Sequence, residues 1–166
     1  LITGCKKADK FTWFNMEYHE TVIVPASTGI SLPFDFFTPE VESNSESAFA
    51  FNDTRKDLIE KILLKKLELT IESPSNEDFS FLKSISVFIS AEGLNEVKVA
   101  WYDNVPANTE NSLKLKTSDI DLKEYISKDQ FNLRVNTVTD EMLTSDYHID
   151  IFSVFFVDAK LLGDNS

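Results

Sequence analysis

The stretch FNLRVN at residues 131–136 alternates strictly between apolar and polar side chains. Successive side chains of a β-strand point to opposite faces, so Phe131, Leu133 and Val135 would line one face and the polar residues the other. This period of two predicts a strand with one buried face and one face in water. Because the same period recurs along most of the chain, it decides the fold class.

Similar patterns predict strands on both sides of this stretch. Leu67, Leu69 and Ile71 alternate with polar residues, as expected for a half-buried strand. The alternating segments 85–89 and 97–101 flank Glu92-Gly93-Leu94-Asn95, which predicts a hairpin. The other expected strands are residues 18–24 and 32–37, separated by a turn with Pro25 and Gly29, and a weaker strand at 47–51.

The last expected strand covers residues 147–159. It alternates at first but is apolar on both sides from Ile151 to Val157. Such a run predicts a strand that is covered on both faces or that switches face at a bulge.

Two helical insertions are expected between the strands. Asp53 or Thr54 would cap a short helix that runs through Ile62, and Ser118 or Asp119 would cap another that runs through Ile126. Residues 78–82 are expected to form a further single turn.

About eight or nine strands with two short helices predict an all-β fold. The expected architecture is an antiparallel β-sandwich of immunoglobulin-like or jelly-roll type. A doubly wound α/β fold would need helices between most consecutive strands, and here most gaps are turns. The chain has 166 residues, enough for one core, and we expect residues 11–166 to form a single domain.

Composition excludes several functions. The net charge is −12, from 28 acidic and 16 basic residues, so the surface would repel phosphate backbones and no nucleic-acid partner is expected. Anionic lipid headgroups are disfavoured for the same reason. The four glycines stand singly, which excludes a P-loop and a dinucleotide-binding fingerprint, and we expect no cofactor.

The N-terminal segment has a pattern typical of the end of a signal peptide. Leu1-Ile2-Thr3-Gly4-Cys5 is followed by Lys6 and Lys7, and Cys5 is the single cysteine of the chain. The segment resembles the lipobox of bacterial lipoproteins, in which apolar and small residues precede a cysteine that receives diacylglycerol. The resemblance covers this segment only, and the domain itself is not assigned to a family.

The lipobox resemblance implies where in the cell the domain is located and how it is anchored. Residues 1–4 would be a signal-peptide remnant, Cys5 the lipidation site and residues 5–10 a polar tether. The protein would be held by its acyl chains in the bacterial cell envelope, in the outer membrane, facing the periplasm or the cell surface. Its membrane partner would be reached through Cys5, and its protein or glycan partner is not identified by the sequence.

Candidate metal ligands and catalytic residues are few. His148 and Asp150 lie two residues apart on an expected strand and therefore share a face, with His19 as the other imidazole of the chain. We expect these residues to stand in water, without forming a metal site or a catalytic site. No Gly-x-Ser-x-Gly segment is present, and no catalytic residue is nominated.

Aromatic residues are weak candidates for ligand binding. Trp13 and Tyr102, with Trp101, would suit stacking against a sugar ring. Trp101 is expected to share a face with Val97 and Val99, which favours packing in the core. Trp13 would cap the bottom of the sandwich or remain exposed.

Two classes of function follow from these observations. The favoured function is a non-catalytic lipoprotein of the cell envelope whose sandwich acts as a binding or assembly module. The alternatives are an exported hydrolase of envelope or extracellular polymers and a carbohydrate-binding module, which predicts an exposed, co-planar pair of aromatic side chains.

Overall fold

The computed structural model describes residues 10–26 and 33–163. Of these residues, 54% lie in strands and 11% in helices. Two helices, α1 (Ser45–Phe51) and α2 (Lys123–Ile126), and two 3-10 turns, Lys56–Leu58 and Phe79–Phe81, lie between the strands. The strands are β1 (Phe11–Val24), β2 (Pro33–Phe37), β3 (Val41–Glu42), β4 (Ile59–Ser73), β5 (Leu82–Ser90), β6 (Val97–Tyr102), β7 (Ser112–Lys114), β8 (Lys116–Thr117), β9 (Gln130–Thr139) and β10 (Tyr147–Lys160).

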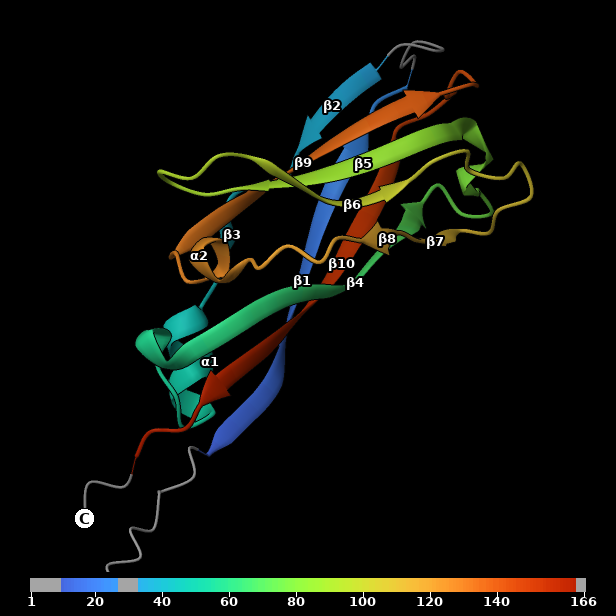
Figure 1. Ribbon diagram of the computed structural model, residues 1–166. Coiled ribbons are helices and arrows are strands. Elements are labelled where there is room, and N and C mark those ends of the chain that lie inside the picture. The colour runs from blue at the N-terminus through green and yellow to red at the C-terminus, as the bar shows by residue number, and fades with distance from the viewer. Residues whose placement is uncertain (1–9, 27–32, 164–166) are drawn as a thin grey trace, which may run out of the picture.

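The strands form two antiparallel sheets (Figure 1). A four-stranded sheet has the order β1-β10-β4-β7, and a six-stranded sheet has the order β2-β9-β5-β6-β8, with β3 also paired to β9. The all-β sandwich with two short helices predicted from the sequence is confirmed.

The pairing of the strands defines the type of sandwich. β1 pairs with β10, β2 and β3 pair with β9, β4 pairs with β7, and β5 pairs with β6. These pairs are nested, so the chain resembles one long hairpin that is rolled into two layers. That is the topology of a jelly roll. In an immunoglobulin-like sandwich the first two strands share a sheet, whereas here β1 and β2 lie in different sheets.

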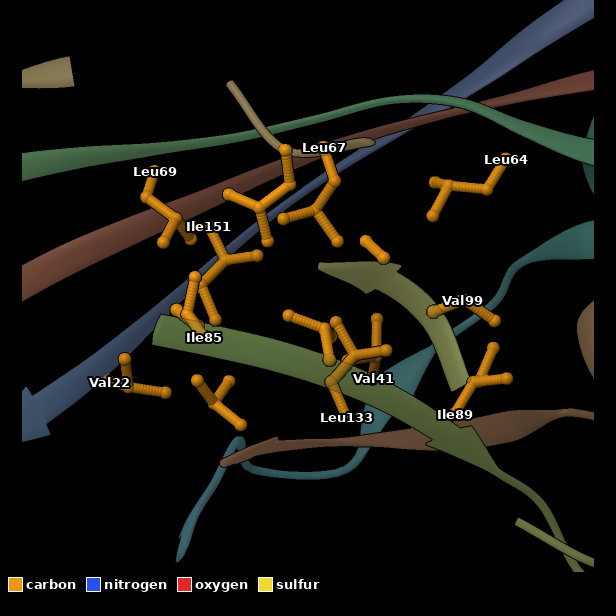
Figure 2. Packing of buried hydrophobic residues seen from close by; sticks show 14 of the residues in the cluster. Val22, Val41, Leu64, Leu67, Leu69, Ile85, Ile89, Val99, Leu133 and Ile151 are labelled. Carbon is orange, nitrogen blue, oxygen red and sulfur yellow. The ribbon is translucent and has the colours of Figure 1, made fainter. Parts of the chain in front are cut away.

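The core lies between the two sheets. Figure 2 shows Leu67, Leu69 and Ile151 of the four-stranded sheet pointing toward Ile85 and Leu133 of the six-stranded sheet. All five are at most 3% exposed. Each such side chain contributes about 1.5 to 3 kcal/mol by leaving water, so this layer supplies much of the driving force for folding.

The alternating stretch at residues 131–136 lies in β9, as predicted. Phe131, Leu133 and Val135 are 0%, 2% and 3% exposed, and the polar residues between them are half-buried on the outer face. β9 lies between β2 and β5, so it pairs with a neighbouring strand on both sides over much of its length.

β10 does not switch face along its apolar run. Its odd-numbered residues from Tyr147 to Ala159 are all buried, and the register shifts against β4 leave this alternation intact. Phe152 and Phe156 lie on the opposite, outer face, where they are half-buried. The switch of face that the sequence left open is therefore wrong, and the outer face of the strand is only partly covered.

The strand expected at residues 47–51 is wrong, because these residues form α1. Phe49 is 1% exposed and makes an edge-to-face contact with Phe14 of β1 at 6.3 Å between ring centroids. A helix of seven residues can be held against the sheets by one buried apolar side chain, here Phe49, and the alanines at 48 and 50 favour helix.

The helix expected from Asp53 or Thr54 through Ile62 is also wrong. Only Lys56–Leu58 form a 3-10 turn, and β4 already begins at Ile59. The pairing of Ile59 and Ile62 with β10 overrides the local capping signal.

The expected helix through Ile126 is shorter than predicted, since α2 spans only four residues. The Asp121 carboxylate accepts hydrogen bonds from the backbone N–H groups of Lys123 and Ile62, and so fixes α2 to β4. The single turn expected at residues 78–82 is confirmed as the 3-10 turn Phe79–Phe81, where the Asp78 side chain accepts from the Ser80 N–H.

Candidate functional site

A row of apolar side chains crosses the outer face of the four-stranded sheet. Phe152, Val154 and Phe156 project from β10 on this face, and β1 adds Trp13 and His19 beside them. We call these five residues the aromatic stripe. It arises because β10 carries large apolar residues at even as well as odd positions. The odd set lies in the core, whereas on the outer face Phe152 and Phe156 are half-buried and Val154 is 9% exposed.

The rings of the stripe lie in pairs across β1 and β10. His19 stands opposite Phe152 in the register, and their rings stack at 4.5 Å between centroids with an interplanar angle of 17°. Trp13 and Phe156 lie 6.3 Å apart at 29°. Trp13 is 73% exposed, so its indole is open to a ligand along most of its surface.

Two lysines of β4 border the stripe. Lys65 Nζ lies 5.1 Å from the centre of the Phe156 ring, and Lys66 Nζ lies 5.1 Å from that of Phe152. A register shift between Val154 and Phe155 leaves Lys65 as an additional residue on β4, so that two consecutive lysines reach the same face. Each cation–π contact is worth about 0.5 to 1 kcal/mol at an exposed position.

Lys66 also forms an ion pair within its own strand. Its Nζ lies 3.0 Å from Glu68 Oε2, and this hydrogen bond holds the pKa of the Glu68 carboxyl below its ordinary value. The charge of Lys66 at the border of the stripe is therefore balanced by the Glu68 carboxylate.

The structure pairs Asp150 with His19 and not with His148. His19 Nδ1 lies 3.0 Å from Asp150 Oδ2, whereas His148 stands on the same outer face, opposite Ile23. Two residues of one strand face are about 7 Å apart, while a diagonal neighbour on the next strand lies within reach of a long side chain. Within residues 10–26 and 33–163, no group of three or more His, Cys, Asp or Glu residues could hold a metal ion.

Trp101 does not pack in the core as expected. A register shift between Val87 and Phe88 places an additional residue on β6, so that Val99 and Ala100 are both buried while Trp101 stands opposite Ser86 on the outer face. Lys98 Nζ lies 5.5 Å from the centre of its ring. The strict alternation assumed from the sequence fails at this bulge.

The aromatic candidates therefore lie on different surfaces. Tyr102 is half-buried and packs against the core, Trp101 stands on the outer face of the six-stranded sheet, and Trp13 stands on the outer face of the four-stranded sheet. The structure does not bring them together as one platform. Trp13 instead stacks on Phe156 of β10. The run of apolar residues from Ile151 to Val157, at even as well as odd positions, was the sequence signal for aromatic residues on this outer face.

The six-stranded sheet carries a polar cluster on its outer face. The Arg134 guanidinium lies 4.2 Å from the centre of the Phe88 ring and donates to Glu96 and Asp35, with oxygen distances of 2.6 Å to each. Asn136 also donates to Asp35, and these bonds hold the pKa of the Asp35 carboxyl below its ordinary value. Since Arg134 has partners on both sides, this cluster ties β2, β9 and the end of the β5–β6 hairpin together.

Open depressions occur around α1 and α2. One of them holds about 470 Å³ and is lined by polar and charged side chains, among them Lys56, Lys128 and Gln130. No helix in the described part of the chain is long and apolar enough to cross a membrane. Cys5 and the other residues of the lipobox-like segment lie outside the described residues.

Comparison with known proteins adds little to this description. No protein-family model matches the chain, and no curated protein sequence gives a significant match. Among solved structures, a chain of tomato aspermy virus is similar with 12% identity and a TM-score of 0.34, over 94% of this chain and 81% of that one. A chain of desmodium yellow mottle tymovirus is similar with 13% identity and a TM-score of 0.29, over 93% and 86%. Both TM-scores are below 0.5, so the assignment of the jelly roll rests on the strand topology.

Proposed function

We propose that this protein is a lipid-anchored component of the bacterial cell envelope whose jelly roll serves as a non-catalytic binding module. The anchor would be the acylated thiol of Cys5, and the contact surface would be the aromatic stripe. The observation that carries the binding role is the set of large apolar side chains on the outer face of a sheet. Trp13 and His19 are exposed, Phe152 and Phe156 are half-buried and Val154 is buried, so a partner would contact the two exposed rings and the accessible parts of the two phenylalanines.

The composition of the stripe suits recognition of an envelope protein or glycan. Flat rings supply apolar area at low conformational cost, and the lysines at positions 65 and 66 add donors at one border. The alternative reading of these lysines is that their aliphatic stems merely shield the rings from water. The two readings differ in whether the rings at positions 152 and 156 are accessible in the cell.

A photocrosslinking experiment in the native host tests the binding role. A photoreactive phenylalanine analogue at position 156 should give a discrete envelope adduct, and His19→Ser, which removes an exposed ring of the stripe outside the end of the sandwich, should reduce its yield at least tenfold. The matched control is the same analogue at Phe37, which is 66% exposed on the outer face of the other sheet. Equal labelling at positions 156 and 37, or no adduct at either, would contradict the proposal.

Mass spectrometry tests the anchor separately. Protein produced with its complete leader should yield an N-terminal peptide that begins at Cys5 and carries the acyl mass. Cys5→Ala should release a folded protein into the soluble fraction, because β1 begins only at Phe11. Recovery of an unmodified peptide that runs from Leu1 through Lys7 would overturn the lipoprotein assignment.

A further inference from the structure

A group of exposed apolar residues, which shares Trp13 with the aromatic stripe, lies at the end of the sandwich where β1 begins and β10 ends. Phe11, Trp13, Phe51 and Leu162 are 59%, 73%, 88% and 45% exposed. We call these four residues the end cluster. Single exposed apolar residues are common on protein surfaces, but four from three separate segments at one end call for an explanation.

Backbone hydrogen bonds hold the three segments together. Phe11 pairs with Lys160 in the register, and the Leu161 N–H donates to the Lys10 carbonyl at 2.8 Å. The Leu162 N–H donates to the carbonyl of Asp53, two residues beyond Phe51, at 2.7 Å. Figure 1 shows α1 beside the start of β1 and the end of β10.

The charge at this end differs from that of the whole chain. The segments at this end, residues 10–13, 45–62 and 158–162, hold five basic and five acidic residues, although the chain as a whole carries −12. The start of β4 belongs to the same end, because Ile59 pairs with Ala159 at the end of β10. This end therefore lacks the acidic excess that would repel an anionic lipid surface.

Chain length limits how far this end can lie from the proposed anchor. Phe11 lies six positions after Cys5, and a fully extended chain covers at most about 3.3 to 3.6 Å per residue, so the two are within about 22 Å of each other. Tryptophan and phenylalanine are favoured at the boundary between headgroups and acyl chains. We infer that the end cluster rests on the lipid surface of the membrane that holds the protein, an inference that depends on the proposed lipid anchor for its biological setting.

This contact would set the orientation of the domain. β1 and β10 would stand away from the membrane, with Trp13 at the lipid surface and the rest of the aromatic stripe above it. At about 3.3 Å per residue, the fourteen residues of β10 span roughly 45 Å. The loop that joins β9 to β10 would then lie far from the bilayer.

Fluorescence of Trp13 on vesicles tests the contact. The full chain with Trp101→Phe, in which Trp13 is the remaining tryptophan, is coupled through its single cysteine, Cys5, to a maleimide phospholipid in phosphatidylethanolamine and phosphatidylglycerol vesicles. Trp13 emission should shift to shorter wavelength, and lipids brominated near the headgroup should quench it at least twofold more strongly than the Trp101 emission of a Trp13→Phe variant. Since the coupling is chemical, the result is independent of whether cells acylate Cys5, which mass spectrometry decides separately.

Substitutions within and outside the end cluster provide the control. Phe11→Ser combined with Phe51→Ser should at least halve the quenching of Trp13. Met142→Ser, which changes a 61% exposed residue between β9 and β10 at the opposite end, should leave it unchanged. Emission of Trp13 that is the same in coupled and free protein, or quenching that the two serine substitutions do not alter, would overturn the inference.

Discussion

Thr137 places a hydroxyl group inside the core. It lies on the inward face of β9 at 3% exposure, and its Oγ1 has no hydrogen-bond partner among the described residues. An unpaired buried polar group costs about 1 to 3 kcal/mol. Thr137→Val keeps the shape of the side chain and removes the hydroxyl, so we expect the free energy of unfolding in urea to rise by about 1 kcal/mol. A fall in stability would show that the hydroxyl is paired in solution.

Glu20 couples stability to pH at the residue scale. It lies on the inward side of β1 between Tyr18 and Val22, where burial, with a smaller contribution from Asp150, raises its pKa above the usual 4.5. Because the folded pKa exceeds the unfolded one, the ionised carboxylate destabilises the fold at neutral pH. This penalty disappears as the pH falls through the raised pKa toward 4.5.

Glu20→Gln should therefore stabilise the protein at pH 7 and have progressively less effect as the pH approaches 4. Urea unfolding of both proteins at a series of pH values measures the difference. A difference that stays constant across this range would show that the ionisation of Glu20 is not responsible.

Side-chain direction was predicted well wherever the strand period is uninterrupted. In β9 and β10 every buried residue except Val154 lies at the expected odd-numbered position, because successive side chains of a strand point to opposite faces. Trp101 was misplaced because one additional residue on β6 reverses the face, and no local sequence signal marks that bulge. The pairing of Asp150 with His19 was missed because it depends on the β1–β10 register, which joins residues 131 positions apart.

At the scale of the element, β4 offers a direct test of the inward and outward faces. Leu69 is 1% exposed and stands between Leu113 of β7 and Ile151 of β10, whereas Thr70 is half-buried on the outer face. Leu69→Ala should lower the free energy of unfolding by about 2 to 5 kcal/mol, and Thr70→Ala by less than about 1 kcal/mol. Urea denaturation measures both, and equal effects would contradict the assigned faces.

Helices were predicted less well than strands, for a physical reason. The two helices have seven and four residues, too short for a 3.6-residue period to stand out from chance. At residues 59–62 the local capping signal competes with pairing to β10, and the pairing prevails because it buries Ile59 and Ile62. A local capping signal therefore fails where strand pairing competes for the same residues.

At the scale of the whole molecule, the nested pairing explains why the sequence left two sandwich types open. Alternation shows that a strand has a buried face, but not which strand lies beside it. The choice between jelly roll and immunoglobulin-like topology depends on β1 pairing with β10 and on β2 pairing with β9, across most of the chain. Much of the binding surface proposed above depends on the same pairing, since the aromatic stripe crosses β1 and β10.

The same topology makes folding depend on the last strand. β10 lies between β1 and β4 and supplies buried residues along its whole length, from Tyr147 to Ala159. A chain that ends at residue 146 would leave β1 and β4 each with an unpaired edge and would open one side of the core. The remaining strands cannot replace the buried apolar residues of β10, so the free energy of their burial would be lost. We expect this truncated chain to lack a cooperative urea transition monitored by tryptophan fluorescence, while the full chain unfolds in one step. A cooperative transition in the truncated chain would show that the six-stranded sheet is stable on its own and that the nested pairing is not required for folding.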